Sequence, residues 1–78
     1  MGRYYFHLHD DLTVIDEEGL ELSGAEAARA KALAMAREMA CAEVLDGHLS
    51  LKHRIEVADD RGEIVAVVPF GETVEIEA

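Results

Sequence analysis

One alanine-rich stretch does most to limit how this chain can fold. Residues 24–46 contain no proline and no glycine after the first position, and most of their side chains favour a helix. Ser23 and Glu26 show the spacing of a capping box at the start, and Gly47 stands where a left-handed C-cap is expected. The sequence therefore predicts one helix of about 35 Å over residues 24–46.

The segments before this helix are typical of β-strands. Residues 3–9 are rich in aromatic side chains, and residues 12–15 are mostly apolar or β-branched. The residues DD between them, and DEEG at 16–19, have the chemistry of turns. We expect two strands here, and residues 20–22 add a short third strand-like piece.

The segments after the helix continue this pattern. In residues 53–58 Ile55 and Val57 alternate with polar side chains, which indicates a half-buried strand. The turn DDRG leads into residues 64–70, which are apolar on both faces of a strand. Residues 73–77 alternate again and fit either an edge strand or a tail.

This order predicts an α+β fold. We expect an antiparallel sheet of about four strands with one long helix packed across one face, in the order β-β-α-β-β. At 78 residues the chain is expected to form a single small domain over residues 1–78.

Charge narrows the range of partners. Seventeen acidic and seven basic side chains give a formal net charge of −10. Such a charge opposes binding to nucleic acids and to anionic membranes, but it suits a basic protein partner. No apolar run is long enough to cross a membrane. The single Cys41 allows no internal disulfide, and no signal peptide is recognised, so we expect a cytoplasmic protein.

The helix carries apolar residues on two aspects. One stripe follows the spacing i, i+4, i+7 and i+11, and a second group lies well round from it. The first consists of Ala28, Ala32, Met35 and Met39; the second consists of Leu33, Ala40, Cys41 and Val44. A helix with two apolar aspects tends to be buried on both.

The expected strands also carry more apolar surface than one helix can cover. We therefore expect a homodimer, joined through the back of the sheet or the second helix aspect. The candidate interface residues are Tyr5, Val65, Val67, Leu33 and Val44. As the alternative, the C-terminal segment or the loop after the helix covers the second face within one chain.

Two histidines raise the question of a metal site. Alternation along the first strand places His7 and His9 on the same face, with Asp10 directly after them. Such residues can chelate a transition metal if further ligands complete the set. As the alternative, this string is the solvated side and end of the strand. No standard metal motif occurs in the chain, so we expect no metal and no cofactor.

The sequence also shows no recognisable catalytic motif. The acidic clusters fall in expected turns, and no glycine-rich phosphate loop occurs. We therefore expect a non-enzymatic protein-interaction module. Metal or small-ligand sensing through His7 and His9 is the alternative from another class. A third is an antitoxin-like neutraliser of a basic partner, which rests on architecture alone.

Three stretches in this order resemble a known family. RYYFHLHDD and DEEGLEL precede the helix AARAKALAMAREM, and RIEVADDRGEIVAVVPF follows it. This arrangement resembles the short bacterial proteins grouped as domain of unknown function 6894. The resemblance covers nearly the whole chain and implies a compact stand-alone domain. It implies no catalytic or binding residue.

Overall fold

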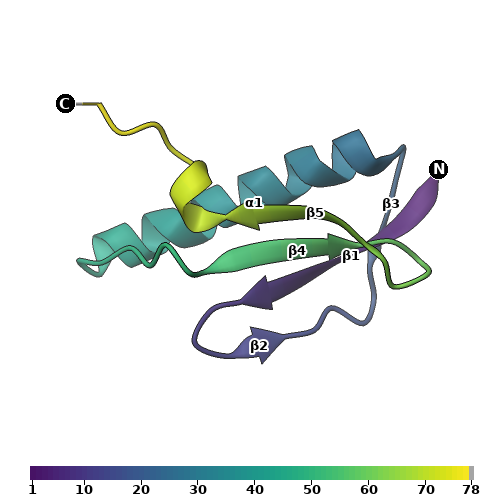
Figure 1. The fold of residues 1–78 in the computed structure, drawn as a ribbon, viewed down its shortest axis with the longest axis horizontal. Coiled ribbons are helices and arrows are strands. Elements are labelled where there is room, and N and C mark those ends of the chain that lie inside the picture. Colours follow the sequence, from purple (N-terminus) through teal and green to yellow (C-terminus); the bar gives the residue numbers. More distant parts are fainter. Residues whose placement is uncertain (78) are drawn as a thin grey trace.

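The computed structural model describes residues 1–77 and contains one sheet and one long helix (Figure 1). The elements in chain order are β1 (Gly2–His9), β2 (Thr13–Val14), β3 (Leu20–Leu22), α1 (Ala25–Leu45), β4 (Arg54–Ala58), β5 (Ile64–Pro69) and the 3-10 helix η1 (Phe70–Glu72). Its extents are 39 × 26 × 16 Å, as expected for one layer of helix on one layer of sheet.

All strand pairs are antiparallel, in the order β2-β1-β4-β5. The two short strands share the outer edge of β1: β3 pairs with residues 2–4, and β2 pairs with Leu8 and His9. The predicted α+β fold is thus confirmed, with four to five strands and one long helix packed against β4 and β5.

The alternation along β1 and β4 is as predicted. Phe6 lies opposite Val57, and Leu8 lies opposite Ile55, on the face that α1 covers. His7 lies opposite Glu56 on the other face. Phe6, Ile55 and Val57 are buried, so this side of the two central strands forms the core.

The helix contacts the sheet through its smallest side chains. Ala28, Ala32 and Ala36 are 0% exposed, and Ala40 is 4% exposed. These four residues follow the spacing i, i+4, so they form one narrow stripe that lets the helix approach the sheet closely. The predicted stripe was partly wrong, because the methionines at 35 and 39 are only half-buried beside it.

A β-bulge changes the prediction for the start of β5. Val57 pairs with Ala66, whereas Ala58 pairs with Ile64, so Val65 is an extra residue on β5. Paired residues share a face, and Ile64 therefore lies on the side of the sheet away from the helix. Simple alternation along the strand predicts that Ile64 and Ala66 share a face, and the bulge makes this prediction wrong.

The helix is one residue shorter at each end than predicted. Its N-cap is Gly24, no side chain caps its first turn, and Ser23 is exposed, so the predicted capping box does not form. At the other end Gly47 has a φ of 91°, the left-handed conformation expected for the C-cap residue.

The segment after η1 forms no strand within the described residues 73–77. Thr73 is buried, and its carbonyl oxygen accepts a hydrogen bond from Arg37 Nε at 2.7 Å. Beyond it the chain runs away from the sheet (Figure 1). Within residues 1–77, no helix has the length and apolar character needed to cross a membrane.

Candidate functional site

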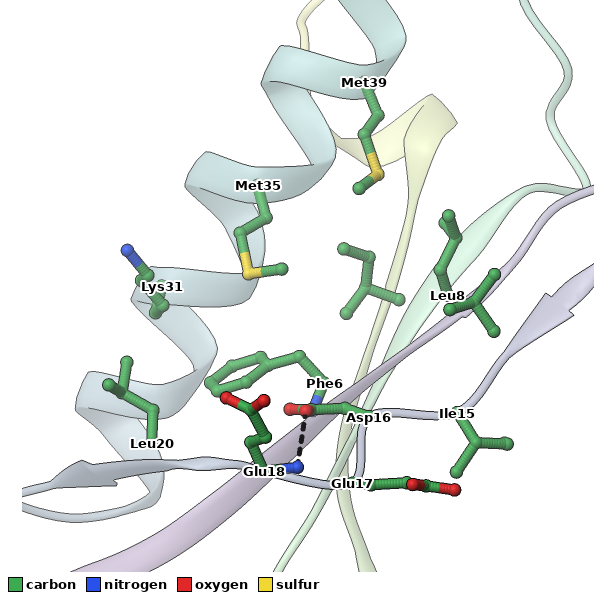
Figure 2. Close-up of a pocket in the computed structure, with 12 residues that line it drawn as sticks. Phe6, Leu8, Ile15, Asp16, Glu17, Glu18, Leu20, Lys31, Met35 and Met39 are labelled. Atoms are coloured by element: carbon green, nitrogen blue, oxygen red, sulfur yellow. Dashed lines mark hydrogen bonds between the residues drawn. The ribbon is translucent and has the colours of Figure 1, made fainter.

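An open groove runs between α1 and the outer strands, on the same face of the sheet as the helix (Figure 2). Its volume is about 610 Å³. The lining residues are Phe6, Leu8, Val14, Ile15, Asp16, Glu17, Glu18, Leu20, Lys31, Met35, Met39 and Ile55. The helix packs mainly against β4 and β5 and covers this side of β1 only in part, and the groove occupies the space that remains.

The helix contributes one wall of the groove. Lys31, Met35 and Met39 lie four residues apart, so they follow one flank of α1 over two turns, about 12 Å. Met35 and Met39 are half-buried and point into the groove (Figure 2). Methionine is flexible and polarizable, so this wall can adapt its shape to a bound apolar side chain.

The sheet contributes the floor and the opposite wall. The floor contains Phe6, Leu8 and Ile55 from β1 and β4. The wall contains Val14 and Ile15, which are 54% and 56% exposed. Apolar side chains left this open beside an apolar floor are typical of a surface that binds another molecule.

The wall is fixed to β1 by Asp16. Its carboxylate accepts hydrogen bonds from the backbone N–H groups of Phe6 at 3.1 Å, Glu18 at 3.1 Å and Gly19 at 3.2 Å. Burial alone would raise the pKa of Asp16, but these three donors outweigh it and the pKa is lowered. Asp16 thereby fills the gap on β1 between the residues that pair with β3 and those that pair with β2. The turn pattern of residues 16–19 predicts a solvated side chain at Asp16, and this prediction is wrong.

Gly19 lets this turn pack tightly on β1. Its φ is 70°, and a Cβ atom there would lie 2.9 Å from Arg3 Cγ, from the Tyr4 carbonyl oxygen and from Tyr5 Cε2. The position therefore requires glycine for both conformation and space. Glu17 and Glu18 are exposed at the rim of the groove on this well-anchored turn.

The two histidines of β1 lie on the sheet face away from the groove. His7 Nδ1 accepts a hydrogen bond from the Asp16 N–H at 3.1 Å. His9 Nε2 lies 2.9 Å from Glu56 Oε1, although it makes no well-aligned hydrogen bond to any residue that the structure describes. Arg54 Nε donates to the other oxygen of Glu56 at 3.1 Å. Burial raises the pKa of Glu56, but Arg54 and His9 outweigh this effect and the pKa is lowered.

Asp10, the third candidate metal ligand, is exposed in the turn after β1. Its carboxylate accepts a hydrogen bond from the Leu12 N–H at 2.9 Å. Among residues 1–77, no group of three or more His, Cys, Asp or Glu side chains is arranged to hold a metal ion.

A third histidine, His53, is buried directly before β4 and was not among the predicted site residues. His53 Nδ1 hydrogen-bonds to Glu43 on α1, and His53 Nε2 lies 3.4 Å from Asp11 Oδ1. Its ring packs edge-on against Phe70 at 5.6 Å. The hydrogen bond to Glu43 raises the pKa of His53 most; burial opposes it, and Asp11 adds to the rise. In Glu43 burial raises the pKa, but the Ser50 N–H, His53 and His48 outweigh it and the pKa is lowered.

This pair predicts a loss of stability as the pH rises. Because the pKa of folded His53 lies above its ordinary value, its contribution is complete below about pH 6.5 and is lost as the pH passes the raised pKa. Glu43 has a lowered pKa, so its contribution is lost only in acid. Thermal unfolding from about pH 5 to about pH 9 should show this alkaline decline, and His53→Gln should flatten it. The exposed His48→Gln should keep most of the decline, and equal profiles in all three proteins would contradict the assignment.

The candidate dimer residues lie on the two alternative surfaces that were named for them, the sheet and the helix. Val65 and Val67 are 39% and 41% exposed on β5, and Val44 is 58% exposed near the end of α1. Tyr5 and Leu33 are half-buried. Within the part of the chain that the structure describes, β5 pairs only with β4, but its edge carries the bulge and ends in a proline, two features that disfavour pairing between sheet edges. Homodimerisation stays a prediction.

Sequence periodicity does not reveal the groove, because it assigns Met35 and Met39 to the buried stripe of the helix. The sequence signal that could have revealed the groove is side-chain volume. The alanines at 32, 36 and 40 repeat every four residues, and this stripe lets the helix approach the sheet more closely than a stripe with methionines does. The hydrogen bonds of His53 to Glu43 and of Asp16 to the Phe6 N–H each join residues that are 10 apart along the chain. No local pattern marks such contacts.

One comparison with known proteins identifies a family. A family model described as a domain of unknown function (DUF6894) matches residues 3–71. No curated protein and no solved structure matches the chain. The matched residues include every lining residue of the groove and both residues of the His53–Glu43 pair. The chain belongs to the DUF6894 family.

Proposed function

We propose that this chain is a non-enzymatic protein-binding domain whose groove holds an amphipathic helix of a partner protein. The observation that carries the proposal is the open apolar groove beside α1, with a methionine wall and an aliphatic wall. Grooves of this kind bind helices through apolar side chains spaced i, i+3 or i+4, and i+7. The two-turn length of the methionine wall suits that spacing.

The composition of the groove supports binding rather than catalysis. Its lining contains no histidine, cysteine, serine or threonine, so it offers no hydroxyl or thiol nucleophile and no histidine base. Its ionisable residues are Asp16, Glu17, Glu18 and Lys31. Among these, the carboxylate of Asp16 already accepts three backbone hydrogen bonds.

A helix of a partner protein fits better than a second copy of this chain. Each copy carries a formal net charge of −10, so two copies repel each other. No such repulsion opposes a partner of opposite charge.

Three synthetic peptides test the groove directly. Each carries leucine at i, i+4 and i+7 in a helical sequence, and the polar face is lysine in one, glutamine in the second and glutamate in the third. The chain has three methionines, whose methyl signals serve as probes. At least one peptide should shift the NMR signals of Met35 and Met39 and leave that of Met1, which is 94% exposed outside the groove, unchanged. If none of the three does so, the proposal fails.

Met35→Glu should weaken this binding by at least about tenfold, because it places a charge among the apolar contacts of the site. Ala34→Glu is the matched control. It adds the same charge one residue away at an exposed position outside the groove, and it should change the affinity little. Equal losses in both variants would exclude the groove as the binding site. Concentration-dependent shifts of Met35 and Met39 without peptide would identify a second copy as the occupant and overturn the proposal.

A further inference from the structure

The charges at the rim of the groove differ between its two walls. Glu17 and Glu18 are exposed on the turn that follows the aliphatic wall. Lys31 lies on the helix wall, one turn before Met35, and is the only basic residue of the lining. A helix in the groove therefore has two carboxylates beside one of its flanks.

These two carboxylates are available to a partner. The hydrogen bonds of Asp16 and the close packing of Gly19 fix the backbone of the turn on β1. In the described chain neither the carboxylate of Glu17 nor that of Glu18 pairs with a basic side chain within 4.0 Å. Arg3 contacts the backbone of Glu18 rather than its carboxylate, since the Glu18 carbonyl oxygen accepts a hydrogen bond from Arg3 at 2.7 Å.

We infer that the partner helix is basic along the flank that faces Glu17 and Glu18. This inference rests on the proposed function, because it names the class of helix that the groove selects. Apolar side chains seat the helix on the groove floor, and lysine or arginine on the flank pairs with the two carboxylates. The net charge of −10 favours the same partner at longer range and speeds its approach.

The same three peptides test the preference for a basic flank separately from the binding of a helix in the groove. The lysine peptide should bind most tightly, the glutamine peptide less tightly and the glutamate peptide least. Added salt should weaken the binding of the lysine peptide and leave the binding of the glutamine peptide nearly unchanged. Binding of all three with equal affinity would support the groove as a helix site and overturn the basic partner. A lack of any binding would overturn both.

A pair of double variants then distinguishes the rim from the overall charge. Replacing Glu17 and Glu18 by glutamine should lower the affinity for the lysine peptide by about three- to tenfold. Replacing Glu75 and Glu77 by glutamine removes the same charge from the exposed tail after η1, on the far side of the sheet from β2 (Figure 1). That control should change the affinity by less than about twofold. If both double variants lower the affinity for the lysine peptide equally, the overall charge alone explains the effect, and the proposed contact with Glu17 and Glu18 is wrong.

Discussion

Phe70→Ala should cause the largest loss of stability among the proposed single substitutions. Phe70 is 1% exposed, and its ring packs edge-on against His53. Removing a buried phenylalanine ring costs about 3 to 5 kcal/mol, because apolar contacts are lost and a cavity remains. A domain of this length has a free energy of unfolding of only about 4 to 12 kcal/mol. One substitution therefore removes a large share of the total.

Thermal and urea unfolding measure this effect. The melting temperature should fall by at least about 12 °C, since each kcal/mol corresponds to about 4 °C or more in a domain of this size. Ile76→Ala is the control, because Ile76 is 83% exposed in the tail, and it should change stability by less than about 0.5 kcal/mol. A loss below about 1 kcal/mol for Phe70→Ala would show that the ring contributes little to the core.

The position of Phe70 explains why the effect reaches beyond its own contacts. Its backbone N–H donates to the His53 carbonyl oxygen at 2.9 Å, and this bond continues the pairing of β4 and β5 by one residue. Its carbonyl oxygen accepts hydrogen bonds from the Thr73 N–H at 3.1 Å and from the Thr73 hydroxyl at 2.6 Å. Loss of the ring thus also loosens the end of the sheet and the 3-10 turn.

Ala36→Leu should produce the second-largest loss of stability. Ala36 is 0% exposed in the stripe of α1 that meets the sheet, so a larger side chain must push the helix away from its neighbours. Overpacking of this kind costs about 1 to 3 kcal/mol. We expect a lower urea midpoint with an unchanged dependence on urea concentration.

Ala34→Leu provides the matched control for this substitution. It places the same side chain on an exposed position of the same helix, where leucine and alanine have similar helix propensities. Its stability should therefore remain close to that of the original protein. If Ala36→Leu is equally harmless, the helix does not approach the sheet as closely as its four buried alanines indicate.

The sequence predicted the elements of this fold well because their signals are local. Alternation in RYYFHLH and RIEVA identified the correct faces of β1 and β4, and Gly47 marked the end of the helix. The bulge at Val65 was missed because it adds one residue to an alternating run without any change in composition.

The lateral position of the helix over the sheet was not predictable in the same way. Periodicity indicates which aspect of a helix is apolar, but not which strands that aspect will cover. Here the alanine stripe selects β4 and β5, and this choice leaves the open groove along β1. The candidate site therefore depends on packing between segments that are distant in the chain. The candidate metal ligands His7 and His9 lie on the opposite face of the sheet.

The anchor at Asp16 has a consequence for how this family can vary. Residues 10–15 form a short arch that begins at the end of β1 and contains the two-residue strand β2, and the carboxylate of Asp16 fastens the far end of this arch to β1. Arches of this kind tolerate insertions and substitutions better than the framework that carries them. If the groove binds a helix as proposed, changes in these six positions alter one wall of the groove on an unchanged scaffold, which makes them the positions to randomise in a library of engineered binders.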